Sequence, residues 1–265
     1  MIGAIAARLG EAWAVCAAIQ LALWLVARRT RNAGVVDVGW ALAFAVVALV
    51  FALGATAPPG SWLPIAMIVV VWSVRLGTYL IARGAATGPE DGRYRDLRAR
   101  WARDADRRFF VFFQAQAALT AILASAFVVP FIVPAHGGLG WLRWPGALLA
   151  ATGILGETCA DAQLRRWKLD PDRRGRVCDA GLWGWSRHPN YFFEWCVWLG
   201  HAVYGVAFAP WGLVAIGGQA IIVASIFGVT GIPPTEAQAL RSKGDAYRDY
   251  QRRVSRFVPR PQRRA

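Results

Sequence analysis

The chain can be interpreted outward from one stretch, Gly181-Leu-Trp-Gly-Trp-Ser-Arg-His-Pro-Asn-Tyr-Phe-Phe-Glu-Trp-Cys-Val-Trp198. Pro189 favours a break in the chain, and the arginine and histidine before it lie ahead of that break. Asn190 and Glu194 are four residues apart, so they share one face of the helix that we expect to follow. Because this helix runs into a nearly uncharged segment, we predict that the stretch lies at the edge of a membrane helix.

The composition indicates a membrane protein. Of the 265 residues 56% are hydrophobic and 17% are charged, which gives more apolar surface than a soluble domain of this length can bury. Seven apolar segments approach the roughly 20 residues that a spanning helix needs. We therefore predict an all-α integral membrane protein with seven transmembrane helices, at residues 12–27, 35–55, 62–82, 109–133, 144–159, 191–209 and 211–230.

The placement of the basic residues predicts the topology. The formal net charge is +14, and of 30 lysines and arginines only Arg8, Arg75 and Arg143 lie outside the basic loops and tail. The positive-inside rule then puts the N-terminus outside and the C-terminus in the cytoplasm. The charge excess faces anionic lipid or an anionic cofactor, so we expect no nucleic-acid partner. The predicted cytoplasmic parts are the loops at about 83–108 and 165–190 and the tail at about 232–265.

Motifs of several other kinds of site are missing from the sequence. The four cysteines have no Cys-x-x-Cys spacing and the three histidines are scattered, so we expect no metal site. No Gly-x-Gly-x-x-Gly or Gly-x-x-x-x-Gly-Lys loop indicates a nucleotide-binding domain. The first apolar segment is followed by Arg28 and Arg29 and is interpreted as an anchor, not as a cleaved signal. We expect one membrane-embedded domain, 1–265, because no repeat or linker is visible.

Ionisable residues at membrane depth are costly and are therefore functional candidates. Asp37 begins the second segment and Arg75 lies within the third. Glu157 and Asp161 close the fifth, and with Arg165 they recur every four residues, which places them on one helix face. For any single member, an internal ion-pair ladder is an equal interpretation. For the whole set, with the asparagine and glutamate of the opening stretch, we favour a buried polar pocket.

Two further charged segments carry candidates. In the loop 83–108 most residues are interpreted as solvated surface, and Glu90, Arg93 and Tyr94 are the exceptions. An acid beside an arginine and a tyrosine can bind ribose, amide or phosphate groups. The tail 244–259 interleaves aromatic residues with arginines. This pattern is typical of an amphipathic helix on the inner leaflet, or of a lid over a bound polyanion, and both can hold together.

Several motifs together resemble one known family. They are Gly181 to Glu194, the tail from Tyr247 to Pro259, the Asp161-x-x-x-Arg165 helix end, Asp37-Val-Gly-Trp40 and Glu90-Asp-x-Arg-Tyr94. With these motifs the chain resembles the steroid 5α-reductase family, and more closely its bacterial branch. The resemblance implies NADPH-dependent reduction of the C=C double bond of a lipophilic enone, most simply a 3-oxo-4-ene steroid. It implies cofactor entry from the cytoplasm and substrate entry from the bilayer. We further expect a monomer in the bacterial inner membrane.

The resemblance also assigns cofactor residues. Three residues match positions that the family uses around NADPH, namely Asn190, Glu194 and Asp161. Independently, the phosphates of NADPH suit basic residues, and its amide and ribose hydroxyls suit an asparagine and carboxylates. The cofactor-binding residues that we predict are Asp161, Arg165, Lys168, His188, Asn190, Tyr191, Glu194, Glu157, Arg93, Tyr94, Tyr250, Arg252, Arg253 and Arg256.

Reduction of an enone sets a further requirement. Hydride attack moves negative charge to the carbonyl oxygen, and a hydrogen-bond donor there lowers the barrier. A carboxylic acid kept protonated by apolar surroundings, or a tyrosine, can serve. We predict Asp37 as the acid, with Tyr79 and Trp40 as further donor or wall residues. Asp37, Trp40, Trp72 and Arg75 are expected to contact the substrate.

Two other interpretations stay open. An S-adenosylmethionine-dependent membrane methyltransferase of the isoprenylcysteine type also resembles the chain, in Arg187-His-Pro-Asn-Tyr191 and in Arg256-Phe-Val-Pro259. That cofactor has no phosphate, so the many arginines favour the dinucleotide. A scaffold or transporter is disfavoured because the polar residues cluster at one cytoplasmic end. The chain departs from the reductase pattern where Glu236 occupies the region of expected histidines and Glu157 replaces an asparagine.

Overall fold

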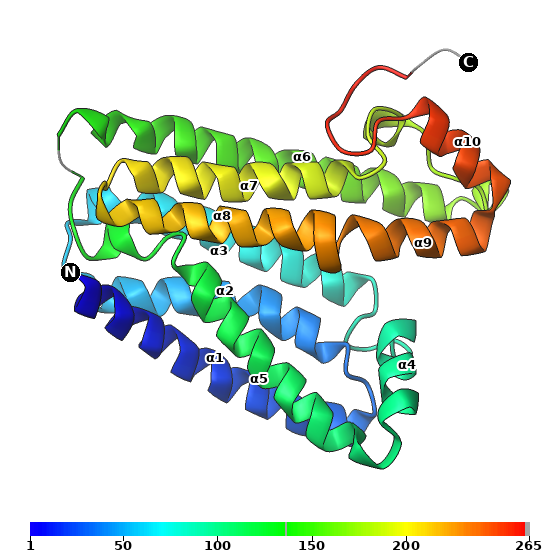
Figure 1. Ribbon diagram of the computed structural model, residues 1–265, viewed down its shortest axis with the longest axis horizontal. Coiled ribbons are helices and arrows are strands. Elements are labelled where there is room, and N and C mark those ends of the chain that lie inside the picture. The colour runs from blue at the N-terminus through cyan, green and yellow to red at the C-terminus, as the bar shows by residue number, and fades with distance from the viewer. Residues whose placement is uncertain (136, 263–265) are drawn as a thin grey trace. The chain divides into compact units, whose positions relative to one another are not determined.

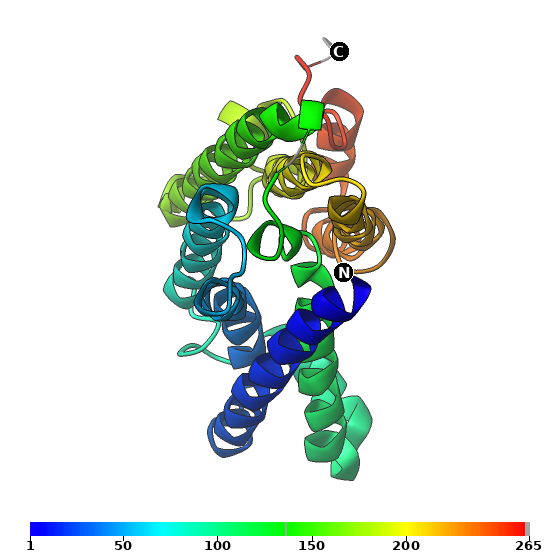
Figure 2. The same cartoon turned by 90° about the vertical axis from the view of Figure 1, so that its left-hand side faces the viewer.

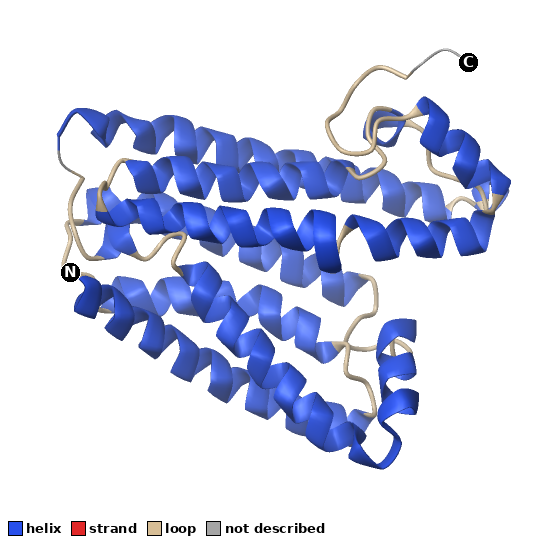
Figure 3. Ribbon diagram, in the orientation of Figure 1, coloured by secondary structure: helices blue, strands red, loops and turns tan. Residues whose placement is uncertain are grey.

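The computed structural model describes residues 1–135 and 137–262, and within these ranges the chain is helical and contains no strand (Figure 3). The all-α prediction is confirmed for these residues. Short 3-10 turns, among them η2 (Val129–Phe131), η5 (Gly181–Gly184) and η6 (Trp211–Val214), and a π-helical turn at Ser225–Val229 join the longer helices. Those labelled in Figure 1 are α1 (Ile2–Thr30), α2 (Val35–Leu53), α3 (Pro59–Ala82), α4 (Gly92–Trp101), α5 (Ala105–Ala124), α6 (Arg143–Leu169), α7 (Pro189–Val206), α8 (Ala215–Ala224), α9 (Ile232–Lys243) and α10 (Asp245–Arg253).

Several helices are long and apolar enough to cross a membrane. In the described ranges there are four such stretches, namely α1, α2, α3 and the run Trp211–Lys243. They are consistent with a multi-pass membrane protein. Each of the seven predicted apolar segments overlaps a helix. The count of seven spans and the outside position of the N-terminus stay predictions.

Several segments differ from their predicted bounds. α1 begins at Ile2, before the expected start at 12, and the predicted segment 211–230 is divided among η6, α8 and the π-helical turn. α5 ends at Ala124, before the expected end at 133, and the chain turns through η2. Pro130 lies in that turn and has no backbone N–H, so it cannot continue an α-helix. In contrast, α6 continues past 159 to Leu169. One uninterrupted helix therefore carries Glu157, Asp161, Arg165 and Lys168.

The described chain divides into two compact units. Unit 1 comprises Met1–Trp141 and Gly205–Gly218, and unit 2 comprises Leu142–Tyr204 and the residues from Gln219 onward. Unit 1 therefore holds α1 to α5, and unit 2 holds α6, most of α7, α9 and α10. The single membrane-embedded domain stays a prediction.

In unit 1, α1 packs on α2 and α5, and α2 packs on α3. Figure 2 shows α1 and α5 crossing each other. Aromatic rings fill the core between α2 and α3, where the Phe44 and Trp72 centroids lie 5.2 Å apart. The Ser73 hydroxyl of α3 donates to Ala41 O (2.5 Å) and accepts from Ala45 N (3.0 Å). This side chain thereby ties α3 to the backbone of α2 inside the apolar core.

In unit 2, α6 and α7 approach closely through small residues. A Cβ added at Gly153 would lie 2.7 Å from Phe193 O, and one added at Gly200 would lie 2.6 Å from Ala150 N. Real Cβ atoms essentially never come so close, so this contact requires glycine at both positions. Small residues allow two helix backbones to approach in this way. By helical spacing, the contact face of α6 comprises Gly146, Ala150, Gly153, Glu157 and Asp161.

The C-terminal helices α9 and α10 are joined at Gly244, whose φ of 53° is a left-handed conformation that favours glycine. The tyrosines of α10 are buried and its arginines Arg248 and Arg252 are exposed, so α10 is amphipathic. The apolar cluster beneath it consists of Tyr247, Tyr250, Val254, Val177, Ala239 and Leu240.

Candidate functional site

The segment before α7 is fixed in place by its own serine. α7 begins at Pro189, at the predicted break, where the missing N–H of proline costs no helical hydrogen bond. The Ser186 hydroxyl accepts from His188 N (3.1 Å) and donates to Phe257 O (2.7 Å). Ser186 and His188 are both buried. The start of α7 is therefore joined to the tail that follows α10.

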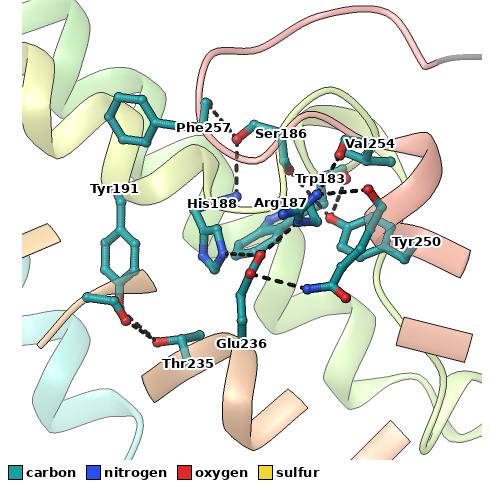
Figure 4. Close-up of polar contacts among 12 residues, drawn as sticks. Trp183, Ser186, Arg187, His188, Tyr191, Thr235, Glu236, Tyr250, Val254 and Phe257 are labelled. Carbon is teal, nitrogen blue, oxygen red and sulfur yellow. Dashed lines mark hydrogen bonds and ion pairs between the residues drawn. The ribbon is translucent and has the colours of Figure 1, made fainter. Parts of the chain in front are cut away.

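Glu236 of α9 is the centre of the polar contacts in this part of unit 2 (Figure 4). One carboxylate oxygen accepts from Arg187 Nε at 2.8 Å and lies 3.2 Å from His188 Nε2. The other oxygen accepts from Gln251 Nε2 at 3.2 Å. A single carboxylate thus binds the segment before α7 and the end of α10 to α9. Sequence reasoning named Glu236 only as a departure from a family pattern and missed this role.

Arg187 extends the same network along the tail. Its Nη1 donates to Gln251 O and Val254 O, each at 2.9 Å, and its backbone N–H donates to Ser255 O at 2.8 Å. Tyr250 contributes a buried hydroxyl that donates to Trp183 O at 2.6 Å. Burial raises the pKa of Tyr250 above its ordinary value, so the phenol stays protonated and keeps this bond. The tail is therefore pinned at several points, as Figure 4 shows.

His188 is held as a neutral ring. Burial lowers its pKa below the ordinary value, although the hydrogen bond to Glu236 acts in the opposite direction. With a carboxylate as its acceptor, Nε2 carries the proton. The ring is stacked on Tyr191, with centroids 5.6 Å apart and an interplanar angle of 12°. The Tyr191 hydroxyl lies 3.3 Å from Thr235 Oγ1 of α9, so the predicted pair His188 and Tyr191 faces α9 together.

An arginine-lined cavity of about 330 Å³ lies in the tail of unit 2. Arg252 is paired with Asp249, and Arg253 lies 3.3 Å from Asp179. Within residues 1–135 and 137–262, no ion pair engages the side chains of Arg256 and Arg260. Guanidinium groups in such a concave site suit phosphate oxygens, which they bind bidentately. The lining residues are Arg187, Gln251, Arg252, Arg253, Val254, Ser255, Arg256, Arg260 and Pro261.

The predicted basic residues are thus only partly gathered. Arg252, Arg253 and Arg256 share the cavity, together with Arg187 and Arg260, which sequence reasoning did not assign. Arg165 and Lys168 are exposed at the end of α6 and do not line this cavity. The signal that could have identified Arg260 is its position directly before a proline in a tail already rich in arginine.

The carboxylates of α6 are buried because they continue its glycine-lined contact face. Glu157 and Asp161 are 5% and 4% exposed. On α7, Asn190 and Glu194 recur at the spacing of the opposing face, and the Glu194 carboxylate accepts from Trp198 Nε1 at 2.8 Å. The predicted polar set of α6 and α7 therefore lies on two helices that are in contact. Carboxylates and an amide there can accept and donate hydrogen bonds to hydroxyl and carboxamide groups.

In unit 1, Asp37 is joined to two other predicted residues. Its carboxylate accepts from the Tyr94 hydroxyl at 2.8 Å and forms an ion pair with Arg93. The guanidinium of Arg93 also lies over the Tyr94 ring, 4.7 Å from its centroid. Asp91, the N-cap of α4, accepts from Arg93 N at 3.0 Å and so begins the helix that presents both residues. Arg93 and Tyr94 thus bind the first turn of α2.

Glu90 forms a second contact of the same loop. Its carboxylate accepts from Arg98 at 2.7 and 3.1 Å and from Ala33 N at 2.8 Å. Burial alone would raise the pKa of Glu90, but the hydrogen bonds from Arg98 and Ala33 hold it below the ordinary value. Glu90 and Tyr94 are therefore held by contacts within unit 1, and the exposed Arg93 pairs with Asp37, while the roles of Arg93 and Tyr94 in cofactor binding stay predictions.

The predicted substrate residues of α2 and α3 form an aromatic group. The ring of Trp40 meets Phe44 edge-on at 5.2 Å and Trp72 at 6.3 Å. The indole N–H of Trp40 is buried and has no acceptor in the described part of the chain. On the next turns of α3, Arg75 lies 5.5 Å from the centroid of the Tyr79 ring. Such a group can contact an apolar ring system, and its one N–H donor can bond to a polar atom carried by that ring system.

These features define a helical protein consistent with several membrane spans, with a polar site where the helices end in arginine-rich segments. The chain belongs to the family described as "Protein of unknown function (DUF1295)", whose model matches residues 23–254. This family falls within the steroid 5α-reductase-like superfamily in the broad sense. A relative is an uncharacterized protein of Schizosaccharomyces pombe, 27% identical over 271 residues, which cover 90% of this chain and 76% of the relative. No solved structure matches the chain.

Proposed function

We propose that the protein is an NADPH-dependent oxidoreductase that reduces the C=C double bond of a lipophilic enone, with 3-oxo-4-ene steroids as the substrate class. The arginine-lined cavity of the tail supports this proposal most strongly. NADPH carries a pyrophosphate and a 2′-phosphate, which guanidinium groups bind well. S-adenosylmethionine carries no phosphate and is cationic at sulfur, so the alternative methyltransferase leaves the cavity without a use.

The residues of unit 2 fit the chemistry of a dinucleotide. Arg256 and Arg260 offer guanidinium groups that no carboxylate of the described chain neutralises. The carboxylates of α6 and the polar pair Asn190 and Glu194 of α7 suit ribose hydroxyls and a carboxamide. We assign His188 and Tyr191 to positioning, because their contacts with Glu236 and Thr235 fix the segment that precedes Asn190. Bound NADPH would supply a hydride.

The residues of unit 1 suit the substrate. In the reduction, a hydride adds to the β-carbon, the electron pair of the double bond moves toward the carbonyl oxygen, and a proton completes the α-carbon. Trp40 is our candidate donor to the carbonyl oxygen, because its N–H has no acceptor in the described residues. Asp37 would supply the proton from a protonated form in which its ion pair with Arg93 is broken, and Tyr94 orients its carboxyl group. We assign Trp72, Arg75 and Tyr79 to the walls of the substrate site.

The test is a cofactor titration of the detergent-purified protein. NADPH and S-adenosylmethionine are titrated separately while thermal stability is followed, since a ligand at 100 times its Kd adds about 2.7 kcal/mol. We expect stabilisation by NADPH, and consumption of NADPH when a 3-oxo-4-ene steroid is added. Stabilisation by S-adenosylmethionine alone would overturn the proposal in favour of the methyltransferase.

A matched pair of variants tests the role of the cavity. Arg256→Gln removes a guanidinium from the cavity and should weaken NADPH binding about tenfold or more, because a hydrogen bond to a charged group contributes roughly 1.5–3 kcal/mol. Arg95→Gln removes one exposed arginine of α4 and should leave the affinity unchanged. Equal affinities in the two variants and the wild type would exclude the cavity as the phosphate site.

A further inference from the structure

Two arginines contact one carboxylate where the end of α1 meets the start of α5 in unit 1. Asp106, in the first turn of α5, lies 3.4 Å from Arg28 Nε and 3.8 Å from Arg31 Nη1. Both arginines stand at the C-terminal end of α1, and their side chains are 48% and 66% exposed. The backbone oxygen of Asp106 also accepts from Trp24 Nε1 at 2.9 Å, which ties the two helices together. These contacts hold two exposed guanidinium groups at the same carboxylate.

The carboxylates that contact this group do not balance its arginines. A third arginine, Arg98, lies 4.0 Å from Asp106, but its guanidinium already donates two hydrogen bonds to Glu90. Because that pair is neutral, two arginines face the single negative charge of Asp106, which leaves a surplus of one positive charge. Asp106 Oδ1 is buried and accepts no hydrogen bond in the part of the chain that the structure describes. Arg31 at 3.8 Å is beyond hydrogen-bond distance, so its N–H groups stay available to an external anion.

The composition of α1 places this end of the helix at the level of lipid headgroups. α1 is one of the stretches that are long and apolar enough to cross a membrane. Residues 12–27 are uncharged and rise about 24 Å at roughly 1.5 Å per residue, which is most of the roughly 30 Å of hydrocarbon in a bilayer. Arg28 is the first charged residue after them, so its long side chain can extend to the phosphate groups.

Exposed apolar side chains lead to Arg28 along one side of α1. Leu21 and Leu25 are 43% and 46% exposed. At about 100° per residue, Arg28 lies about 20° from Leu21 and about 60° from Leu25 around the helix axis. The guanidinium also lies over the Trp24 ring, 4.9 Å from its centroid, and this ring meets Phe110 of α5 edge-on at 5.2 Å. This side of α1 therefore offers an acyl chain an apolar surface that ends at a cation.

We propose that Arg28 and Arg31 bind the phosphate of an anionic phospholipid, with an acyl chain of the same lipid along Leu21 and Leu25. A phosphodiester carries one negative charge, which matches the surplus of one positive charge, and guanidinium groups can bind its oxygens bidentately. A lipid whose headgroup carries no cation of its own is preferred, because that cation would face the arginines. Asp106 positions the two guanidinium groups. The site uses none of the residues assigned to NADPH and does not rest on the proposed function.

Two double variants of the full-length protein test the site. Arg28→Gln with Arg31→Gln removes both proposed ligands of the phosphate. Arg29→Gln with Arg107→Gln removes the same charge from the same ends of α1 and α5, at exposed arginines that form no ion pair in residues 1–135 and 137–262. Each protein is extracted from bilayers of phosphatidylglycerol and phosphatidylcholine, and the retained lipid is quantified by native mass spectrometry.

The two variants should differ in the lipid that they retain. The preference for phosphatidylglycerol over phosphatidylcholine should fall about tenfold or more in the first variant, because charge-assisted hydrogen bonds to the phosphate are lost. It should change little in the second, since salt screens charges outside the site. Equal loss in both variants would show a general attraction to the leaflet and overturn the site, and so would no loss in the first.

A charge-preserving variant excludes misfolding as the cause of a loss. Arg28→Lys with Arg31→Lys should retain most of the phosphatidylglycerol, because the attraction of the headgroup depends mainly on charge. A loss as large as that of the glutamine variant would overturn the proposal.

Soluble phosphate compounds distinguish the lipid from other ligands. Glycerol 3-phosphate in excess should leave the retained phosphatidylglycerol unchanged, because it has no acyl chain; displacement would overturn the assignment to a lipid. NADPH affinity should be the same in the wild type and in Arg28→Gln with Arg31→Gln, and a decrease would assign these arginines to the cofactor instead. If none of the proteins binds NADPH, the reductase proposal fails and the lipid comparison still stands.

Discussion

Glu90 in unit 1 and Glu236 in unit 2 make similar hydrogen bonds, but the arginines around them differ in how fully they are paired with carboxylates. Each accepts hydrogen bonds from an arginine and from a second segment of the chain. At Glu90 the charge of the arginine is paired with the carboxylate, because Arg98 donates through two nitrogens to the two carboxylate oxygens. Around Glu236 the tail supplies more arginines than the neighbouring carboxylates can pair, so Arg256 and Arg260 line a cavity without such a partner in the described residues.

A surplus of unpaired charge distinguishes the group around Glu236 from the ion pair at Glu90. Both glutamates hold a loop or tail to a helix, and both have shielded side chains. Only the second group has a surplus of one charge sign in a concave place, and a surplus attracts an external ion of opposite sign. Glu90 therefore has a structural role in unit 1, whereas Glu236 in unit 2 positions the segments that carry the cavity arginines.

The largest effect on stability is expected for Glu90→Ala. The substitution leaves Arg98 and Ala33 N without their acceptor, and the side chains of Glu90 and Arg98 are only 8% and 16% exposed. Breaking a buried ion pair costs about 3–5 kcal/mol, which thermal unfolding in detergent should reveal as a large decrease in Tm. Glu11→Ala breaks the exposed Arg8–Glu11 pair and should change stability by less than about 1 kcal/mol. Similar Tm values for both variants would show that Glu90 is not a buried support.

A more local effect is expected for Glu236→Ala. Losing this acceptor releases Arg187, His188 and Gln251, so the tail after α10 should open more often. Limited digestion with trypsin measures this opening at the arginines of residues 252–260. We expect cleavage there to accelerate about tenfold or more, whereas Glu90→Ala should leave the tail rate unchanged. Equal acceleration in both variants would abolish the distinction between the two glutamates.

The smallest effect is expected from a change in pH. His188 and Glu90 should affect the free energy of unfolding in different pH ranges. The pKa of His188 is lower in the folded protein than its ordinary value of 6.5, so the unfolded chain binds a proton first as the pH falls below that value. The free energy of unfolding should therefore decrease as the pH falls below about 6.5, and His188→Gln should reduce this slope. Glu90 has a lowered pKa, so its contribution is present above the ordinary value of 4.5 and is lost only as the pH falls further. An unchanged slope in His188→Gln would assign the decrease to other groups.

Local spacing allowed much of the architecture to be predicted from the sequence. Pro189 placed the start of α7, and the apolar segments placed the long helices, because both signals depend on neighbouring residues. The same holds for Glu157 and Asp161, whose shared face follows from four-residue spacing. The number of spans is not decided by these signals, since α6 carries charged residues within its length.

The long-range contacts could not be predicted. Glu236 is 49 residues from Arg187, and no pattern in the sequence pairs them. Likewise, the hydrogen bond from Ala33 N to Glu90 joins residues 57 apart, and a backbone donor leaves no trace in side-chain composition. Tail arginines were expected near a polyanion, but which of them share a cavity depends on how residues 251–261 turn back beside Arg187.

The glycine contact between α6 and α7 has a consequence for how relatives of this chain can diverge. Backbone meets backbone there, so the separation of the two helix axes is fixed by main-chain atoms and not by adaptable side chains. A descendant that had to accommodate a bulkier ligand could not gain width by exchanging a residue of this seam. New specificity would have to arise in side chains outside this seam, while the spacing of α6 and α7 stayed unchanged.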